Sequence, residues 1–248
     1  SIVIEHLNYI YSENTAYQRQ ALKDINLEIP EGQFIGLIGH TGSGKSTVVN
    51  LIPRYYDVTK GSVKVDGVDV RDMTQKELRD KLGYVPQKGV LFSGTIDSNI
   101  RYGKPEITDA QVKEAAEVAQ ATEFIDTKPK KYESPVSQGG TNVSGGQKQR
   151  LSIARAIAKE PEIFIFDDSF SALDFKTDSQ LRKALKEYTK DATTVIVAQR
   201  ISTILGADQI IVLDDGHMAG IGTHKELMAN CEVYQQIARS QLSEEELA

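Results

Sequence analysis

The feature that most constrains the fold is a glycine-rich octapeptide that directly follows a short apolar run. Residues 39–46 read GHTGSGKS and fit the pattern G-x-x-x-x-G-K-[ST], and residues 34–38 before them have the composition of a buried strand. In this context the glycines let backbone N–H groups turn toward phosphate oxygens, Lys45 supplies a positive charge and Ser46 offers a hydroxyl to Mg²⁺. The octapeptide therefore predicts a strand–loop–helix unit that binds phosphate groups and magnesium.

Short apolar runs alternate with amphipathic segments along much of the chain. The apolar runs lie at residues 35–38, 163–166, 194–198 and 210–213, and amphipathic segments lie at 47–52 and 180–188. Buried runs of four or five apolar residues separated by helices are what a parallel sheet covered on both faces requires. We therefore expect an α/β core.

Two parts of the chain depart from this alternation. Residues 1–30 alternate apolar and polar positions, as antiparallel strands do. Between residues 88 and 159 strand signals are few, and Thr108 and Gln111 have the spacing of a capping box before a helical run at 112–124. We expect one domain over residues 1–248, with a core lobe (1–87 and 160–248) and an inserted helical lobe (88–159).

Composition argues against several classes of protein. The net charge of −6 is unfavourable for a nucleic-acid partner, because phosphate neutralisation requires clustered Lys and Arg. The apolar runs are far shorter than the roughly 18 residues that span a bilayer, and residues 1–10 lack a secretory pattern. We therefore expect a soluble, cytosolic chain. Cys231 is the only cysteine, which excludes an internal disulfide and a thiolate zinc cluster.

A second candidate phosphate-site residue is Asp167, which ends the apolar run at 163–166. Strand ends in parallel sheets point into the ligand crevice, and a carboxylate there can hold Mg²⁺ through water. Taken alone, an apolar run that ends in Asp is more often only a strand and a turn. Together with the octapeptide, Asp167 predicts a second ligand of the magnesium ion.

Residues 143–147 read VSGGQ and are followed by KQR. Ser144 and Gln147 have capping-box spacing, so a helix is expected to begin there with free N–H groups at Gly145 and Gly146. This pentapeptide closely resembles LSGGQ, the signature sequence of ATP-binding cassette (ABC) proteins. The resemblance extends over residues 2–240, and the stretches at 91–103 and 207–227 are similar to those of exporter cassettes.

The resemblance implies a fold and partners. The fold is a phosphate-loop NTPase core of the RecA-like type, with an N-terminal antiparallel β subdomain and an inserted α-helical subdomain. The implied activity is that of a transporter ATPase, which binds ATP and Mg²⁺ at the cytoplasmic face of the cell membrane and contacts the coupling helices of transmembrane domains. Two cassettes of this family pair head to tail, so that the signature of one covers the γ-phosphate held by the other. The chain would then be an excised domain.

The resemblance also assigns residues to the nucleotide site. Tyr11 looks like the aromatic that stacks on adenine, with Tyr17 as a competing candidate. Gln87 is similar to the Gln that touches Mg²⁺, and Asp174 ends a loop that resembles the one crossing to the opposite site. The expected nucleotide-binding residues are Tyr11, Gly39, Thr41, Gly42, Ser43, Gly44, Lys45, Ser46, Thr47, Gln87, Ser144, Gly145, Gly146, Gln147 and Asp174. The expected metal-binding residues are Ser46, Gln87 and Asp167.

Two expected catalytic positions depart from the pattern of active cassettes. Asp168 stands in place of Glu, and its shorter side chain withdraws the carboxylate by about 1 to 1.5 Å, which can cost about a hundredfold in rate. Gln199 stands in place of the switch His; it can hydrogen-bond a γ-phosphate but cannot become cationic. We therefore expect a site that binds ATP and hydrolyses it slowly. Pro135 also replaces a Glu usual in exporters, a change that bears on communication with the coupling helices.

Three interpretations of function remain open. The chain resembles the degenerate-site subunit of a heterodimeric exporter, whose intact signature completes the competent site of a second, non-identical cassette. Alternatively, it is a homodimeric exporter cassette with an active Asp168 site. The third interpretation is a soluble ABC ATPase used in DNA repair or translation, although 248 residues leave no room for the second cassette or coiled-coil insertion usual there.

Overall fold

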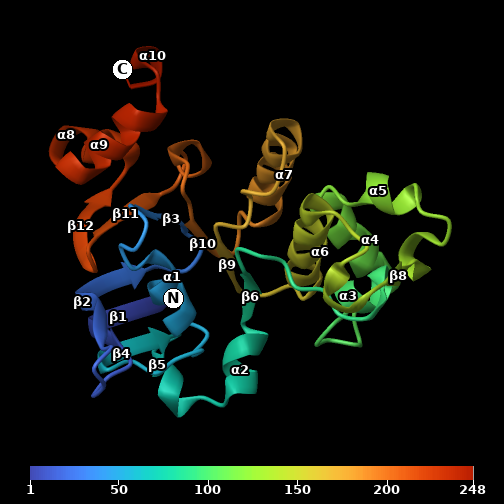
Figure 1. Cartoon of the computed structure of the whole chain (residues 1–248), viewed down its shortest axis with the longest axis horizontal. Coiled ribbons are helices and arrows are strands. Elements are labelled where there is room, and N and C mark those ends of the chain that lie inside the picture. Colours follow the sequence, from blue (N-terminus) through green and yellow to red (C-terminus); the bar gives the residue numbers. More distant parts are fainter. Residues whose placement is uncertain (248) are drawn as a thin grey trace. The chain divides into compact units, whose positions relative to one another are not determined.

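The computed structural model describes residues 1–247, which form two compact units. The first unit contains Ser1–Leu82 and the chain from Thr193 onward, and the second contains Gly83–Ala192. In Figure 1 the first unit is blue to teal and orange to red, and the second is green to gold. Residues 88–159, the expected helical lobe, lie in the second unit together with β9 (Ile163–Asp167) and α7 (Phe175–Tyr188). Residue 248 lies outside the described part of the chain.

An antiparallel sheet opens the first unit, as the alternating pattern predicts. Its strands, in spatial order, are β2 (Arg19–Ile29), β1 (Ile2–Tyr11), β4 (Lys60–Val65) and β5 (Val68–Asp69). On β1, Ile4 faces Leu27 of β2 on one side and Val63 of β4 on the other, and all three side chains are buried. The apolar positions of the pattern thus form the buried face of this sheet.

Four further strands of the first unit lie side by side. Their order is β12 (His217–Gly222), β11 (Gln209–Asp214), β3 (Phe34–Gly39) and β10 (Thr193–Val197). The central strand β3 runs parallel to both β10 and β11, whereas β12 is antiparallel to β11. All five residues of β10 are buried, as expected for a parallel strand covered on both faces. The α/β core is therefore confirmed.

Helices of the first unit follow its strands. They are α1 (Lys45–Leu51), η1 (Val70–Asp72), α2 (Gln75–Asp80), η4 (Ile201–Thr203), α8 (His224–Asn230), α9 (Glu232–Gln241) and α10 (Glu244–Leu247). The helix α9 is anchored by Tyr234, Ile237 and Ala238, which are at most 5% exposed. Their spacing of three and four positions places them on one face of the helix.

The second unit combines four strands with a group of helices. Strand β6 (Leu82–Val85) neighbours β9, and the short strands β7 (Gly94–Thr95) and β8 (Pro135–Val136) pair with each other. The helical elements are α3 (Ile96–Ile100), α4 (Asp109–Val118), α5 (Thr122–Asp126), η2 (Lys131–Glu133), η3 (Gln138–Gly140), α6 (Gly145–Ala158) and α7. Within residues 1–247, no helix combines the length and the apolar content that crossing a bilayer requires.

The helix predicted at 112–124 begins as expected but is interrupted. Thr108 caps α4 and exchanges two hydrogen bonds with Gln111, at 2.8 and 3.2 Å, which confirms the capping box. However, α4 ends at Val118, because Gln120 adopts φ 59° and the Ala121 N–H donates to the Ala116 carbonyl at 2.8 Å. These features form a Schellman-type stop, which sequence periodicity did not reveal.

Candidate functional site

The glycine-rich octapeptide joins β3 to α1, as its sequence predicts. Gly42 (φ 81°) and Gly44 (φ 107°) adopt left-handed backbone conformations that favour glycine, and Gly44 is the N-cap of α1. The Lys45 ammonium lies over the loop, where it donates to the carbonyl oxygens of Gly39 and, at 3.3 Å, His40. Thr41, Gly42 and Ser46 are exposed. The loop thus presents a helix N-terminus, a cation and a hydroxyl together, the combination that binds phosphate groups.

The turn between β11 and β12 is hydrogen-bonded to this loop. The Gly216 N–H donates to the Ser43 carbonyl at 2.9 Å, and the Gly216 carbonyl accepts from the Lys23 N–H at 2.9 Å. Gly216 has φ 79°, and a Cβ atom there would lie 2.5 Å from the Ala21 carbonyl oxygen. Any side chain at Gly216 would therefore displace the support of the phosphate loop. The Ser43 hydroxyl is buried, and no described residue hydrogen-bonds it.

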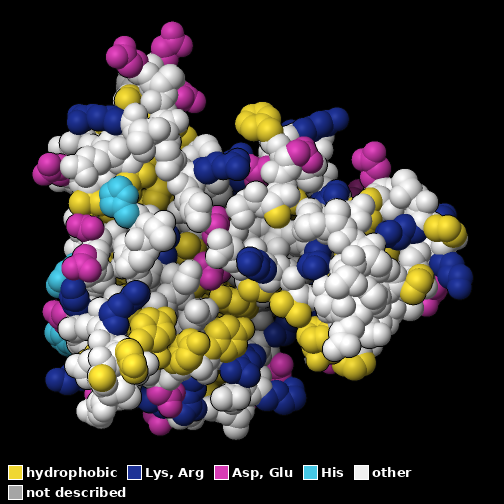
Figure 2. Space-filling model, in the orientation of Figure 1, with side chains coloured by type: hydrophobic (Ala, Val, Ile, Leu, Met, Phe, Trp, Pro, Cys, Tyr) yellow, Lys and Arg dark blue, Asp and Glu magenta, His cyan; other side chains and the backbone are white. Residues whose placement is uncertain are grey.

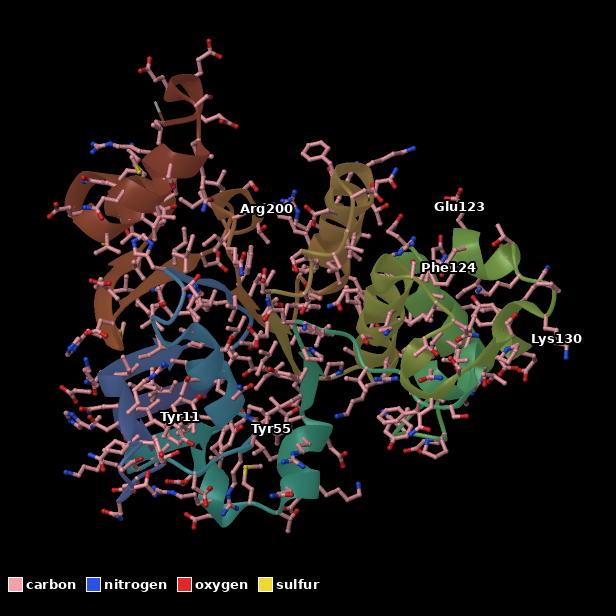
Figure 3. The ribbon with its side chains drawn as sticks, in the orientation of Figure 1. Tyr11, Tyr55, Glu123, Phe124, Lys130 and Arg200 are labelled. Carbon is pink, nitrogen blue, oxygen red and sulfur yellow. The ribbon has the colours of Figure 1, made fainter. Side chains whose placement is uncertain are left out.

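A cluster of aromatic residues lies beside α1. The Tyr11 and Thr47 hydroxyls share a hydrogen bond of 2.8 Å, and the Tyr9 and Tyr56 rings stand edge-on to Tyr11 at 4.7 and 6.2 Å. Figure 2 shows hydrophobic side chains gathered on the face of the first unit where Figure 3 labels Tyr11 and Tyr55. Tyr17, the competing candidate, is 87% exposed. The geometry therefore favours Tyr11 as the residue held next to the phosphate loop.

Two carboxylates follow each other at the end of β9 in the second unit. Asp167 is 6% exposed and accepts a hydrogen bond of 3.3 Å from the Tyr84 hydroxyl. Asp168 adopts φ 49°, and its carboxylate accepts from the Gln87 amide nitrogen at 3.1 Å. Because the Gln87 nitrogen donates to Asp168, the amide oxygen is the atom through which Gln87 could bind a cation. Carboxylate and amide oxygens are suitable ligands for Mg²⁺ that also binds phosphate.

The signature residues form the predicted helix start. The Ser144 hydroxyl accepts from the Gln147 N–H at 3.1 Å, and the Gln147 amide oxygen accepts from the Ser144 N–H at 3.4 Å, which confirms the capping box of α6. Ser144 and Gly145 are exposed, and a Cβ atom at Gly145 would meet nothing within 4 Å. The packing of the chain itself does not require glycine at position 145. The close approach of a ligand to the backbone would require it.

Arg150 supports the start of α6 from its second turn. Its guanidinium donates to the Gly146 and Gln120 carbonyls at 3.2 and 2.9 Å, and it lies 4.7 Å from the centre of the Phe124 ring, which Figure 3 labels. Burial lowers the pKa of the Arg150 guanidinium, and the charge of Asp174 opposes this shift. The Arg150 guanidinium, a cation, therefore lies against the backbone of the signature at Gly146.

Asp174 acts as the N-cap of α7. Its carboxylate accepts from the Thr177 N–H at 2.9 Å and from the Thr177 hydroxyl at 2.7 Å, and these hydrogen bonds lower the pKa of Asp174. The loop before Asp174 also approaches the signature, since a Cβ atom at Gly146 would lie 3.4 Å from the Ala172 carbonyl oxygen. The structure thus brings two predicted site segments together within the second unit.

Gln199 lies in the first unit, just after β10. The Ala198 N–H donates to the Leu37 carbonyl of β3 at 3.0 Å, whereas Gln199 and Arg200 are exposed. Figure 3 labels Arg200 on this connection between β10 and η4. The expected site residues are therefore divided. The octapeptide, Thr47, Tyr11 and Gln199 belong to the first unit, and the others belong to the second.

Residues 22–171 match the model of the ABC transporter family. The chain belongs to this family. It is 45% identical over 236 residues to a protein of Staphylococcus aureus strain NCTC 8325 whose name describes a multidrug export ATP-binding/permease protein. This match covers 95% of the chain and 40% of the relative. A similarly named protein of the bovine strain RF122 is 46% identical over 236 residues, and this match also covers 95% of the chain and 40% of the relative.

A solved structure of a bacterial Atm1-family ABC exporter with ATP bound has the same fold. Its TM-score is 0.91 at 35% sequence identity, and the match covers 98% of this chain and 42% of that chain. The ABC fold expected from the signature resemblance is therefore confirmed. The chain spans about two fifths of the length of these relatives.

Three residues that contact the ABC motifs were missed by sequence reasoning. They are Tyr84 on Asp167, Gly216 beneath the phosphate loop and Arg150 behind the signature. The Asp215-Gly216 pair is a turn signal and could have predicted the hairpin between β11 and β12. No local pattern could have predicted that this hairpin contacts Ser43.

Proposed function

We propose that this ABC cassette binds Mg-ATP and pairs head to tail with a second, non-identical cassette. The main support is that both anion-binding helix starts of the family are intact, the phosphate loop at α1 and the signature at α6. In the proposal Tyr11 stacks on adenine, and the loop residues Gly39 to Thr47 hold the phosphates. Ser144 to Gln147, together with Asp174, act on the nucleotide of the partner.

The proposed magnesium ligands are Ser46, Asp167 and Gln87. When bound, Mg²⁺ neutralises charge on the β- and γ-phosphate oxygens. The residues fit this ion: Ser46 is exposed at the start of α1, and the Gln87 amide oxygen remains for a cation while its nitrogen contacts Asp168. Tyr84 orients Asp167 by donating to one of its carboxylate oxygens.

The proposed nucleotide site hydrolyses ATP slowly. Asp168 is the candidate base that polarises the attacking water, and its carboxylate is drawn toward Gln87 by the 3.1 Å hydrogen bond. Gln199 is the candidate γ-phosphate contact and carries no charge. Asp168 has a shorter reach than Glu, and Gln199 lacks the charge that His can carry, so both changes support a degenerate site. The intact signature of this chain would then complete a competent site on the partner.

The proposal for the whole protein follows from its relatives. Proteins named for multidrug export and an Atm1-family exporter match nearly the full chain, and each is more than twice its length. We propose that the cassette works at the cytoplasmic face of a membrane, where transmembrane domains and their coupling helices convert ATP binding and hydrolysis into export. These relatives favour an exporter over the soluble ABC ATPase. The homodimeric exporter remains the second candidate, because Asp168 keeps a carboxylate at the catalytic position.

The decisive experiment compares ATP binding with ATP turnover. We expect the isolated chain to bind Mg-ATP at micromolar to millimolar concentrations and to turn it over slowly. Turnover should rise on mixing with a cassette that has the catalytic Glu, the switch His and an altered signature. Lys45→Ala is the control that should lose binding. Fast turnover by the isolated chain would contradict the degenerate site, and stimulation by nucleic acid would favour the soluble alternative.

A further inference from the structure

The side chain of Gln241, at the end of α9, bridges the backbone on both sides of Arg200. Its amide nitrogen donates to the Gln199 carbonyl at 2.7 Å, and its amide oxygen accepts from the Ile201 N–H at 2.7 Å. One side-chain amide thus makes both hydrogen bonds that a neighbouring strand would make to this segment. We call Gln199, Arg200 and Ile201 the switch segment.

The helix that carries Gln241 is firmly held. Tyr234 is fully buried, and its hydroxyl is hydrogen-bonded to the His224 ring at 2.7 Å. Ile237 and Ala238, one turn before Gln241, are also buried. The Leu242 N–H closes the helix by donating to the Ala238 carbonyl at 2.8 Å. The Gln241 amide is therefore not needed to cap α9, and a rigid element presents it to the switch segment.

The switch segment is fixed through its backbone while two of its side chains face solvent. On one side the Ala198 N–H is bound to the Leu37 carbonyl of β3, and on the other Ile201 is fully buried. Between these points Gln199 and Arg200 are exposed. Between these points the Gln241 amide holds the backbone through its two hydrogen bonds, to the Gln199 carbonyl and from the Ile201 N–H.

We propose that Gln241 is a positioning residue for Gln199. This inference rests on the proposed function, in which Gln199 contacts the γ-phosphate of ATP. By fixing the backbone, Gln241 removes conformational freedom that would otherwise be lost when the nucleotide binds. A merely structural role would act equally on all nucleotides. A positioning role acts on ATP, which has a γ-phosphate, and not on ADP, which lacks one.

The test measures Mg-ATP and Mg-ADP affinities of the 248-residue chain with Gln241→Ala. We expect ATP affinity to fall about two- to tenfold, the range of one net hydrogen bond, with ADP affinity unchanged. Gln241→Glu should behave similarly, because a carboxylate keeps the acceptor for Ile201 but faces the Gln199 carbonyl. Gln236→Ala, an exposed position on the same helix, is the matched control and should change neither affinity.

Two further measurements make the outcome unambiguous. In a Gln199→Ala background, Gln241→Ala should cause no additional loss of ATP affinity, because Gln241 affects ATP only through the Gln199 side chain. Hydrogen exchange of the Ile201 amide should be faster in Gln241→Ala even without nucleotide. Equal losses for ATP and ADP, additive losses in the double variant, or unchanged exchange at Ile201 would each overturn the positioning role. A wild-type chain that binds no ATP would instead overturn the proposed function, whereas the exchange result would still stand.

Discussion

At the scale of single residues, the site is defined by what surrounds each carboxylate. Asp167 and Asp168 are adjacent in sequence but differ in environment: one accepts from a tyrosine hydroxyl, and the other accepts from the amide of Gln87. Asp168 adopts φ 49°, a left-handed backbone conformation outside the extended range of the strand that ends at Asp167. The roles proposed for these neighbouring carboxylates, one toward a metal ion and one toward water, thus belong to two different environments.

We predict that Asp168→Glu raises the ATP turnover of the chain by roughly 10- to 100-fold, because the added methylene restores the reach of the carboxylate. Steady-state phosphate release measures this effect. Asp168→Asn keeps the shape without the charge, so it should leave ATP affinity nearly unchanged and lower turnover further. Equal turnover by Asp168→Glu and wild type would show that the shorter side chain does not limit the reaction.

At the scale of elements, helix starts carry several of the functional segments. The octapeptide ends in the first turn of α1, the signature ends in the first turn of α6, and Asp174 caps α7. At such positions backbone N–H groups lack helical partners, so they bind either a side chain or an external anion. Asp174 and Ser144 each accept one such N–H within the chain, and Gly145 at the start of α6 is exposed.

The Asp174 cap predicts a pH dependence of stability. Because the folded pKa is lowered, this carboxylate contributes stability fully above its unfolded pKa, about 3.9, and loses it as the pH falls through the folded pKa. Asn caps nearly as well but does not titrate. We therefore expect wild type to have a higher thermal midpoint than Asp174→Asn at pH 7, and the difference to shrink as the pH falls below about 3.9.

Thermal midpoints of the two chains between pH 7 and pH 3 test this prediction. Asp174→Ala removes the cap at every pH, so its midpoint should lie below that of Asp174→Asn throughout the range. A difference between wild type and Asp174→Asn that does not depend on pH would mean that the Asp174 charge contributes nothing.

At the scale of the whole molecule, the expected nucleotide-binding residues are divided between two compact units. The phosphate loop and Tyr11 belong to the unit that also contains both chain ends, and the carboxylates and the signature belong to the other. A ligand that binds only folded protein stabilises it in proportion to the logarithm of its concentration. Nucleotide should therefore protect the unit that carries the phosphate loop.

We predict that Mg-ATP at a hundred times its Kd raises the free energy of unfolding by about 2.7 kcal/mol. Urea denaturation followed by near-UV circular dichroism of the tyrosines measures the change. Lys45→Ala should unfold at the same urea concentration with and without nucleotide. An equal shift in Lys45→Ala and wild type would mean that the stabilisation does not arise at the phosphate loop.

Local chemistry was sufficient to predict the phosphate loop, the caps at Thr108 and Ser144, and the buried strands of the core. In each case the interacting groups lie within a few positions of each other, so their spacing alone determines the geometry. The contacts that orient the site could not be predicted in this way. Tyr84 reaches Asp167 across 83 positions, and Gln241 reaches Gln199 across 42. Only tertiary packing brings such residues together, because hydrogen bonds between them leave no periodic trace in the sequence.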